Sequence, residues 1–256
     1  MTLLQILILF AASVLGGILN AVAGGGSFFT FPSLIVTGIS AIQANATSTV
    51  ALWPGIVASV GAYRRELIKQ RRDLLFLLVG ISLIGGVLGA ILLLKTSQAV
   101  FVRLIPYLLL LATLLFAFSG PITARLRTRS IDKTPSSRRA LIGVSAAQLI
   151  IAIYGGYFGG GIGILMLTTL AMMGLDNIHE MNALKTLLAS CINGIAVVTF
   201  IIAGAVVWPE AILMIFGAIL GGYGGAYYAR KIAPKWVRLF VITVGIVLTI
   251  YFFLRS

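Results

Sequence analysis

Residues 45–49 read Asn-Ala-Thr-Ser-Thr, and residues 182–186 read Asn-Ala-Leu-Lys-Thr. Each stretch opens a long apolar run, and further similar pairs recur in the same order at an offset of 135 to 137 residues. These pairs are Gly24–Gly26 with Gly159–Gly161, Gly85–Ala90 with Gly221–Ala226, and Phe101–Leu104 with Trp236–Leu239. Ordered pairs at a nearly constant offset indicate that the chain is a duplicated unit.

The composition indicates that both units lie in a membrane. Sixty per cent of the 256 residues are hydrophobic and only 10% are charged, against roughly 25% charged residues in soluble domains. Apolar runs of about 20 residues can cross a bilayer as helices, whereas the alternating segments of a transmembrane barrel are absent. The sequence therefore predicts an all-α polytopic membrane protein. Its eight long spans are expected near residues 2–23, 42–63, 74–94, 100–119, 140–158, 183–207, 211–229 and 237–254.

The repeats define the domain boundaries. We expect a first membrane repeat at 1–119, a basic cytoplasmic linker at 120–139 and a second membrane repeat at 140–256. A short apolar stretch follows each glycine triplet, at 27–39 and at 162–173. Each is too short for an ordinary span, so each is predicted to be a half-helix, a re-entrant segment or a thin tilted crossing.

The positive charge is concentrated in short loops. The net charge is +13, and 15 of the 19 Lys and Arg residues lie in three stretches. Short basic loops fix cytoplasmic orientation and contact anionic lipid, and no loop is long enough for a folded nucleic-acid-binding module. The three stretches are Arg64, Arg65, Lys69, Arg71 and Arg72; Arg125, Arg127, Arg129, Lys133, Arg138 and Arg139; and Arg230, Lys231, Lys235 and Arg238.

Equivalent loops of the two repeats carry opposite charge patterns. The loop at 64–73 is strongly basic, but its counterpart at 203–209 has no Lys or Arg. The loop at 95–103 carries two such residues, and its counterpart at 230–238 carries four. Equivalent loops on opposite sides of the membrane are typical of inverted repeats. Parallel repeats with four crossings each remain the alternative.

The glycine triplets are candidate binding elements. Glycine disfavours a helix interior by about 1 kcal/mol relative to alanine, so each triplet predicts a break. A break lined by a cavity exposes backbone N–H groups and the positive end of the next helix, which attract anions. Close helix packing through small residues is the alternative. The candidates are Gly24, Gly25, Gly26, Ser27, Gly159, Gly160 and Gly161.

Polar residues at the start of two spans form a second candidate group. Asn45 and Thr49 share one helix face at i, i+4, and Asn182 and Thr186 repeat that spacing. Hydrogen bonding between helices is the alternative role for these side chains. The other polar candidates are Asn20, Gln43, Thr47, Ser48, Lys185 and Asn193.

Lys185 is the only one of these candidates that carries a charge. A lysine ahead of a long apolar run is costly in a membrane and usually faces a cavity or a partner, so it is a candidate for binding an anion. The alternative is a lysine that extends to the membrane surface, paired with Glu180 or Asp176.

The sequence predicts no catalytic residues, no cofactor and no metal site. The stretch from His179 to Ala183 begins like a zinc-protease helix but lacks the second histidine. The single cysteine, Cys191, permits no intramolecular disulfide. The N-terminal span ends in a stretch, Ala21–Ala23, that resembles a signal-peptidase site, but the positive region of a signal peptide is absent from residues 1–5, so we expect a permanent span.

The stretch Gly-Gly-Gly-Ser-Phe-Phe-Thr-Phe-Pro at 24–32, together with 45–49 and 182–186, resembles the sulfite exporter TauE/SafE family of membrane permeases. The resemblance covers nearly the whole chain. It implies transport of small sulfur-containing anions, such as sulfite, sulfoacetate or related organosulfonates, across the inner membrane. The second repeat departs from the first, with Ile162 in place of Ser27 and Leu167 in place of Pro32, so two unequal half-sites are expected.

Together these features predict a permease that binds its anion at the midplane between the repeats and alternates access by rocking them. An anion channel, a non-transporting membrane scaffold and an unrecognised membrane enzyme are the alternatives. Besides the anion, the expected partners are membrane lipids. The sequence leaves open the substrate, the direction, the coupling ion and whether the chain forms a homo-oligomer.

Overall fold

The computed structural model describes residues 1–22, 25–129, 138–172, 175, 177–228 and 234–255, and within these ranges it is all-helical, without strands. In the first half lie α1 (Leu3–Val22), α2 (Ser27–Val36), α3 (Ala41–Ala62), α4 (Arg64–Ile68), α5 (Arg72–Lys95) and α6 (Gln98–Arg129). In the second half lie α7 (Arg138–Tyr157), α8 (Ile162–Met172), α9 (Ile178–Ile202), α10 (Trp208–Tyr228) and α11 (Pro234–Arg255). The all-α prediction is confirmed.

The apolar helices overlap most of the predicted spans. Within the described residues, four stretches are long and apolar enough to cross a bilayer: Leu3–Asn20, Arg72–Lys95, Gln98–Phe118 and His179–Ile202. Shorter apolar stretches lie in α2, α7, α8, α10 and α11. Helix α3 is in neither group, because its first two turns carry Asn45 and a run of hydroxyl residues. A multi-pass helical membrane protein follows, while the total of eight long spans stays a prediction.

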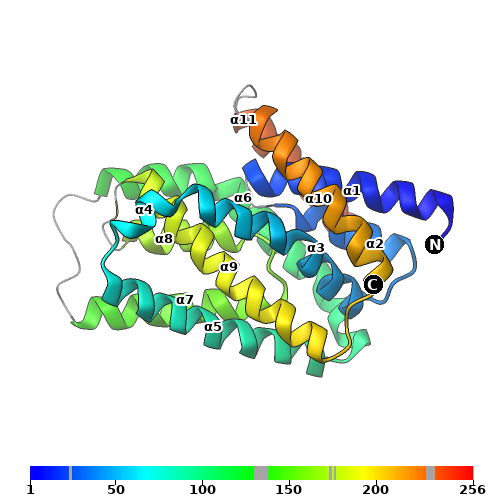
Figure 1. Cartoon of the computed structure of the whole chain (residues 1–256), viewed down its shortest axis with the longest axis horizontal. Helices are drawn as coiled ribbons and strands as arrows, with labels where there is room; N and C mark the ends of the chain where they lie inside the picture. Colours follow the sequence, from blue (N-terminus) through cyan, green and yellow to red (C-terminus); the bar gives the residue numbers. More distant parts are fainter. Residues whose placement is uncertain (23–24, 130–137, 173–174, 176, 229–233, 256) are drawn as a thin grey trace.

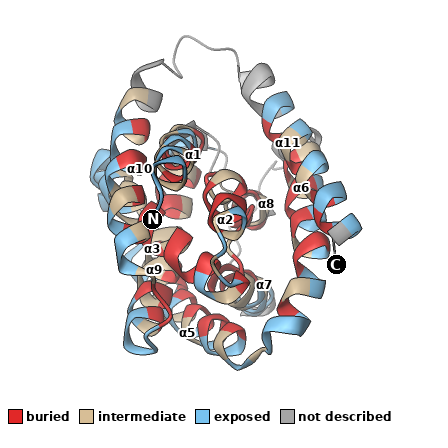
Figure 2. Cartoon of the chain, turned by 90° about the vertical axis from the view of Figure 1, so that its right-hand side faces the viewer, coloured by how far each residue is buried: buried red, intermediate tan, exposed pale blue. Residues whose placement is uncertain are grey.

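The two short segments are helices that begin directly after the glycine triplets. Helix α2 has 10 residues and α8 has 11, so each extends only about 15 Å at 1.5 Å per residue. Both lie inside the bundle (Figure 2). They have the length of the predicted half-helices.

Two helical segments were not predicted. Helix α4 forms one short turn after α3, and α6 continues to Arg129, into the stretch expected to be a linker. Arg, Leu and Glu have high helix propensity. This accounts for helix in stretches that were expected to be a loop and a linker only because they are basic. The boundary of the two repeats stays a prediction, since residues 130–137 lie outside the described part.

Glycines bring two pairs of helices into backbone contact. Helix α1 packs along α10, and α5 packs along α7. In the first pair, Gly17 lies against the backbone of Ala218, and Gly221 lies against that of Val14. In the second pair, Gly89 lies against the backbone of Ile153. Small residues allow this approach, and van der Waals packing then holds the helices together where lipid removes the hydrophobic driving force.

The outward faces of the bundle are apolar, as expected for contact with lipid. Phe76 on α5 is 71% exposed, Phe216 on α10 is 62% exposed and Ile202 at the end of α9 is 82% exposed. Figure 2 shows exposed residues on the outer sides of the helices and buried residues toward the centre. A soluble protein would not leave so many large apolar side chains in water.

Helices at equivalent positions of the repeats run in opposite directions. In Figure 1, α1 runs from right to left and α7 from left to right, and α3 and α9 differ in the same way. An inverted repeat requires this arrangement, whereas parallel repeats would give equivalent helices the same direction.

Two glycines of α5 test the backbone contact. A methyl group at Gly89 would overlap the backbone carbonyl of Ile153, but one at Gly80 would meet nothing within 4 Å. We expect Gly89→Ala to destabilise the protein by about 1–3 kcal/mol through overpacking, and Gly80→Ala to leave it unchanged or slightly stabilised. Thermal unfolding in detergent measures both, and equal melting temperatures for the two variants would contradict the account.

Candidate functional site

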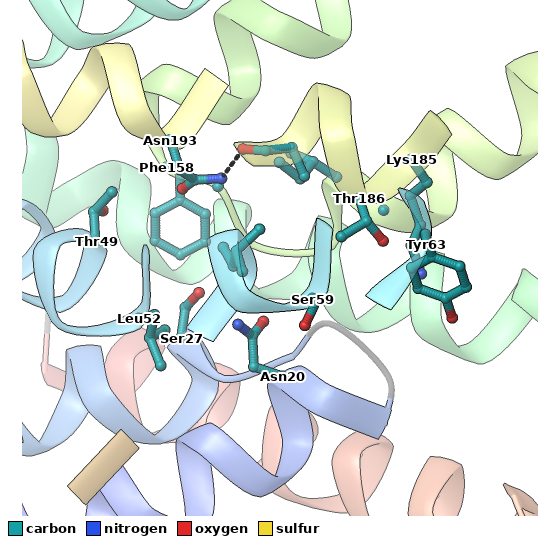
Figure 3. A pocket seen from close by; sticks show the side chains of 15 residues that line it. Asn20, Ser27, Thr49, Leu52, Ser59, Tyr63, Phe158, Lys185, Thr186 and Asn193 are labelled. Carbon is teal, nitrogen blue, oxygen red and sulfur yellow. Dashed lines mark hydrogen bonds between the residues drawn. The ribbon is translucent and has the colours of Figure 1, made fainter. Parts of the chain in front are cut away.

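A cavity of about 120 Å³ lies within the bundle and is lined by residues of both halves (Figure 3). Five segments contribute to it: the end of α1, the start of α2, the inner face of α3, the turn into α8 and the first half of α9. The lining residues are Asn20, Ser27, Thr49, Leu52, Ile56, Ser59, Tyr63, Phe158, Gly159, Ile162, Gly163, Lys185, Thr186, Ala189 and Asn193.

Helix α3 contributes one continuous face. Its lining residues follow one another at steps of three and four: Thr49, Leu52, Ile56, Ser59 and Tyr63. This spacing places side chains on a single side of an α-helix. One wall of the cavity therefore carries both polar and apolar groups.

Helix α9 forms the opposite wall. Lys185, Ala189 and Asn193 follow at steps of four, and Thr186 lies beside Lys185. The two walls cross where the indole Nε1 of Trp53 donates a hydrogen bond of 3.1 Å to the backbone oxygen of Ser190. Gly194 allows this contact, because an added Cβ would lie 3.0 Å from Trp53 Nε1.

The first turns of both short helices face the cavity. Ser27 opens α2, and Ile162 and Gly163 open α8. The first N–H groups of a helix have no partner within it and carry partial positive charge. Gly159 and Gly161 in the turn before α8 adopt left-handed backbone angles, with φ of +80° and +78°, which glycine adopts without strain. These glycines let α7 end and α8 restart beside the cavity.

Lys185 supplies the positive charge of the site. The residue is half-buried, and its stem packs on α8, because a Cβ added to Gly163 would lie 3.3 Å from Lys185 Cδ. No carboxylate lines the described cavity. Glu180, the expected partner, instead accepts hydrogen bonds from Gln70 Nε2 at 3.1 Å and Asn177 Nδ2 at 3.3 Å. Asp176 lies outside the described residues. Lys185 therefore forms no ion pair with the described part of the chain.

The cavity brings together part of the predicted set. Residues predicted from sequence that line it are Asn20, Ser27, Thr49, Gly159, Lys185, Thr186 and Asn193. They come from both halves of the chain that were predicted to be repeats from sequence similarity. Of the two glycine triplets, the second contributes to the cavity lining, through Gly159.

Three buried residues of α3 lie outside the cavity and hold neighbouring segments. Asn45 Nδ2 donates to the backbone oxygen of Tyr157 at 3.1 Å. Thr47 Oγ1 accepts from the backbone N–H of Val207 at 3.1 Å, and the hydroxyls of Ser48 and Thr30 lie 2.6 Å apart. These three residues therefore form hydrogen bonds between segments, which is the alternative role considered for them in the sequence.

The remaining candidates also lie away from the cavity lining. Gly25 and Gly26 are buried at close contacts, with Phe116 and with the backbone oxygen of Gly16, respectively. Gln43 is exposed and accepts a hydrogen bond from Ser40 Oγ. Gly160 and Gly161 pack near Phe158 and Ala112. Asn182 lines no described cavity, and Gly24 lies outside the described residues.

Three residues that line the cavity were not predicted from the sequence: Ser59, Tyr63 and Phe158. The first two lie 10 and 14 residues after Thr49, so the three-and-four spacing from Thr49 was the signal that would have found them. Phe158 directly precedes the second glycine triplet and was not distinguished from other apolar residues. Its ring forms an edge contact with Phe31, with centroids 5.7 Å apart.

The arrangement suits binding of an anion. One ammonium group, two helix starts and neutral side chains surround the cavity, and among the described residues no cluster of three His, Cys, Asp or Glu exists to hold a metal. A half-buried lysine with no ion-pair partner among the described residues is stabilised by a bound anion or by water.

A cysteine at position 59 tests access of water to the cavity. In a Cys191→Ala background, we expect Ser59→Cys to react with a hydrophilic maleimide, because Ser59 lines the cavity. Ser48→Cys should stay unmodified, because Ser48 is 2% exposed and packed against Thr30. Mass spectrometry of the intact protein measures the adduct. Equal modification of both cysteines, or none at position 59, would contradict the assignment of the cavity.

Comparisons with known proteins agree with a transporter. Residues 9–252 match the family described as "Sulfite exporter TauE/SafE". A "Probable membrane transporter protein" of Haemophilus influenzae is 26% identical over 94% of this chain and 92% of its own length. The "Probable membrane transporter protein YfcA" of Escherichia coli K12 is 26% identical over 94% of this chain and 87% of its own. For the "Probable membrane transporter protein ORF9" of a Sinorhizobium species, the values are 27%, 94% and 90%. No solved structure matches the chain. The chain belongs to the sulfite exporter TauE/SafE family of membrane transporters.

Proposed function

We propose that this transporter is a carrier that moves a small sulfur-containing anion, such as sulfite, sulfoacetate or a related organosulfonate, across the inner membrane. The observation that supports the proposal best is Lys185, which has no counter-charge among the described residues and lies in a cavity faced by two helix starts. The basic loops at 64–73 and 230–238 favour an orientation with both on the cytoplasmic side.

The cavity offers an oxyanion two kinds of interaction. The ammonium group of Lys185 provides three hydrogen-bond donors and a full charge. The starts of α2 and α8 provide partial positive charge, although several of their first N–H groups already donate to the preceding turns: Phe28 N to Gly25 O at 3.2 Å, Phe29 N to Gly26 O at 3.1 Å and Ile164 N to Gly161 O at 3.1 Å. Since no described carboxylate lines the cavity, neither interaction competes with a protein anion. An oxyanion with several acceptor oxygens can use both at once.

An inverted repeat would give this site alternating access. Trp53 on α3 and Ser190 on α9 are hydrogen bonded and lie 137 residues apart, which is also the offset between Asn45 and Asn182. Equivalent positions of the two repeats thus meet where α3 and α9 cross, as they do at an axis of pseudo-twofold symmetry. We propose that the repeats rock about this crossing, so that the cavity opens to one side of the membrane at a time.

Removing the charge of Lys185 tests the site. A charge-assisted hydrogen bond contributes about 1.5–3 kcal/mol, so we expect Lys185→Gln to weaken sulfite binding by about 10- to 100-fold. Lys95→Gln is the matched control, because Lys95 is exposed at the end of α5 and lines no described cavity. Titration calorimetry of purified protein gives both affinities. Wild-type affinity in Lys185→Gln would refute the anion site.

Flux kinetics distinguish the proposed carrier from a channel. In liposomes loaded with unlabelled sulfite, we expect external labelled sulfite to accumulate transiently, because a carrier exchanges one bound anion for another. Lys185→Gln liposomes should lose this counterflow, and Lys95→Gln liposomes should keep it. Sulfite flux that neither saturates nor shows counterflow would point to a channel, and no flux of any sulfur anion would point to a non-transporting protein.

A further inference from the structure

Several polar side chains of the cavity have already committed their hydrogen-bond donors to their own helix. Each hydroxyl group donates its only hydrogen to the backbone oxygen four residues earlier, so its oxygen is left as an acceptor, and the Asn193 amide uses one of its two N–H groups in the same way and leaves Oδ1 as an acceptor. The bonds are Thr49 Oγ1 to Asn45 O at 2.8 Å, Ser59 Oγ to Gly55 O at 2.9 Å, Thr186 Oγ1 to Asn182 O at 2.7 Å and Asn193 Nδ2 to Ala189 O at 2.8 Å.

Charge and acceptors are separated along the cavity. Figure 3 shows Lys185 at one end beside Tyr63, and Thr49 and Asn193 at the other end beside the ring of Phe158. Lys185 and Asn193 are eight residues apart on α9, which corresponds to about 12 Å of helix. An inorganic oxyanion held at Lys185 is too small to reach the other end as well.

The acceptor end favours a ligand group that brings its own donor. A hydroxyl group of the protein can rotate to donate to a ligand acceptor. It then loses its hydrogen bond to the backbone, so the number of hydrogen bonds does not increase. A ligand hydroxyl that donates to Thr49 Oγ1 or to Asn193 Oδ1 adds a hydrogen bond without breaking one. A carboxylate there would meet the lone pairs of Thr49 Oγ1, offset only by the second N–H group of Asn193. Between the two ends, Phe158 and Leu52 offer apolar surface to a short carbon chain.

We infer that the cavity selects a short organosulfonate whose far end is a hydrogen-bond donor, with the sulfonate at Lys185 and a hydroxyl group at Thr49 and Asn193. The inference rests on the proposed function, because it requires the anion to bind at Lys185. It separates hydroxyalkylsulfonates from alkylsulfonates, which lack the donor, and from sulfoacetate, which carries a carboxylate at that end.

Two ligands of equal charge and nearly equal size test the inference. Calorimetry with the purified full-length protein compares 2-hydroxyethanesulfonate with ethanesulfonate. One additional hydrogen bond contributes about 1 kcal/mol net, so we expect the hydroxylated ligand to bind about fivefold more tightly. Sulfoacetate should bind more weakly than ethanesulfonate. This comparison uses the wild-type protein alone.

Substitutions then locate the acceptor. Thr49→Val removes the oxygen and should make the two affinities equal, while Thr49→Ser keeps the oxygen and should keep the preference. Thr199→Val is the control, because Thr199 bonds to its own helix in the same way, at 2.8 Å to Ile195 O, but lines no described cavity.

The outcomes separate the inference from the proposed function. Equal affinity of the two ligands for the wild-type protein, or tighter binding of sulfoacetate than of ethanesulfonate, would overturn the inference. If binding still required Lys185 in that case, the anion site would stand. A preference that survives in Thr49→Val but is lost in Thr199→Val would also overturn the inference. No binding of any of these ligands or of sulfite would overturn both.

Discussion

A lysine charge inside an apolar helix bundle is the constraint on which this structure depends. At the centre of a membrane helix a lysine is unfavourable by about 2.5–3.5 kcal/mol even in mild estimates. Lys185 is half-buried, and no described carboxylate pairs with it. Its charge therefore requires water or an anion beside it. This one group lies at one end of a cavity that is otherwise lined by the starts of α2 and α8 and by neutral side chains.

Close helix packing keeps that cavity in place. At the contacts of α1 with α10 and of α5 with α7, glycines bring backbones together, so these helices form rigid pairs on either side of the crossing of α3 and α9. The crossing itself is held by Trp53 and Ser190. Closely packed pairs on either side of the crossing would keep their internal contacts in the proposed rotation about it. This division of the bundle is compatible with alternating access.

Much of the fold could be predicted from the sequence, because the relevant signals are local. Apolar runs gave the long helices, and the glycine triplets gave the breaks before α2 and α8. The candidate site could be predicted in part: Thr49, Lys185 and Asn193, which line the cavity, were noticed because polar residues in apolar helices are conspicuous. Asn45 was placed on the correct helix, but its partner at Tyr157 is 112 residues away and no local pattern reveals such a contact. The two triplets also differ in role, since Gly26 allows close packing and Gly159 allows a left-handed turn.

Selenite, a heavier analogue of sulfite, tests the central claim most directly. Anomalous diffraction from crystals soaked in selenite locates the selenium atom independently of the surrounding density. We expect a peak within hydrogen-bonding range of Lys185 Nζ, beside the first turn of α8, and its loss in Lys185→Gln crystals. A selenium peak elsewhere in the bundle, or a Lys185 side chain paired with a carboxylate of the protein, would contradict the account.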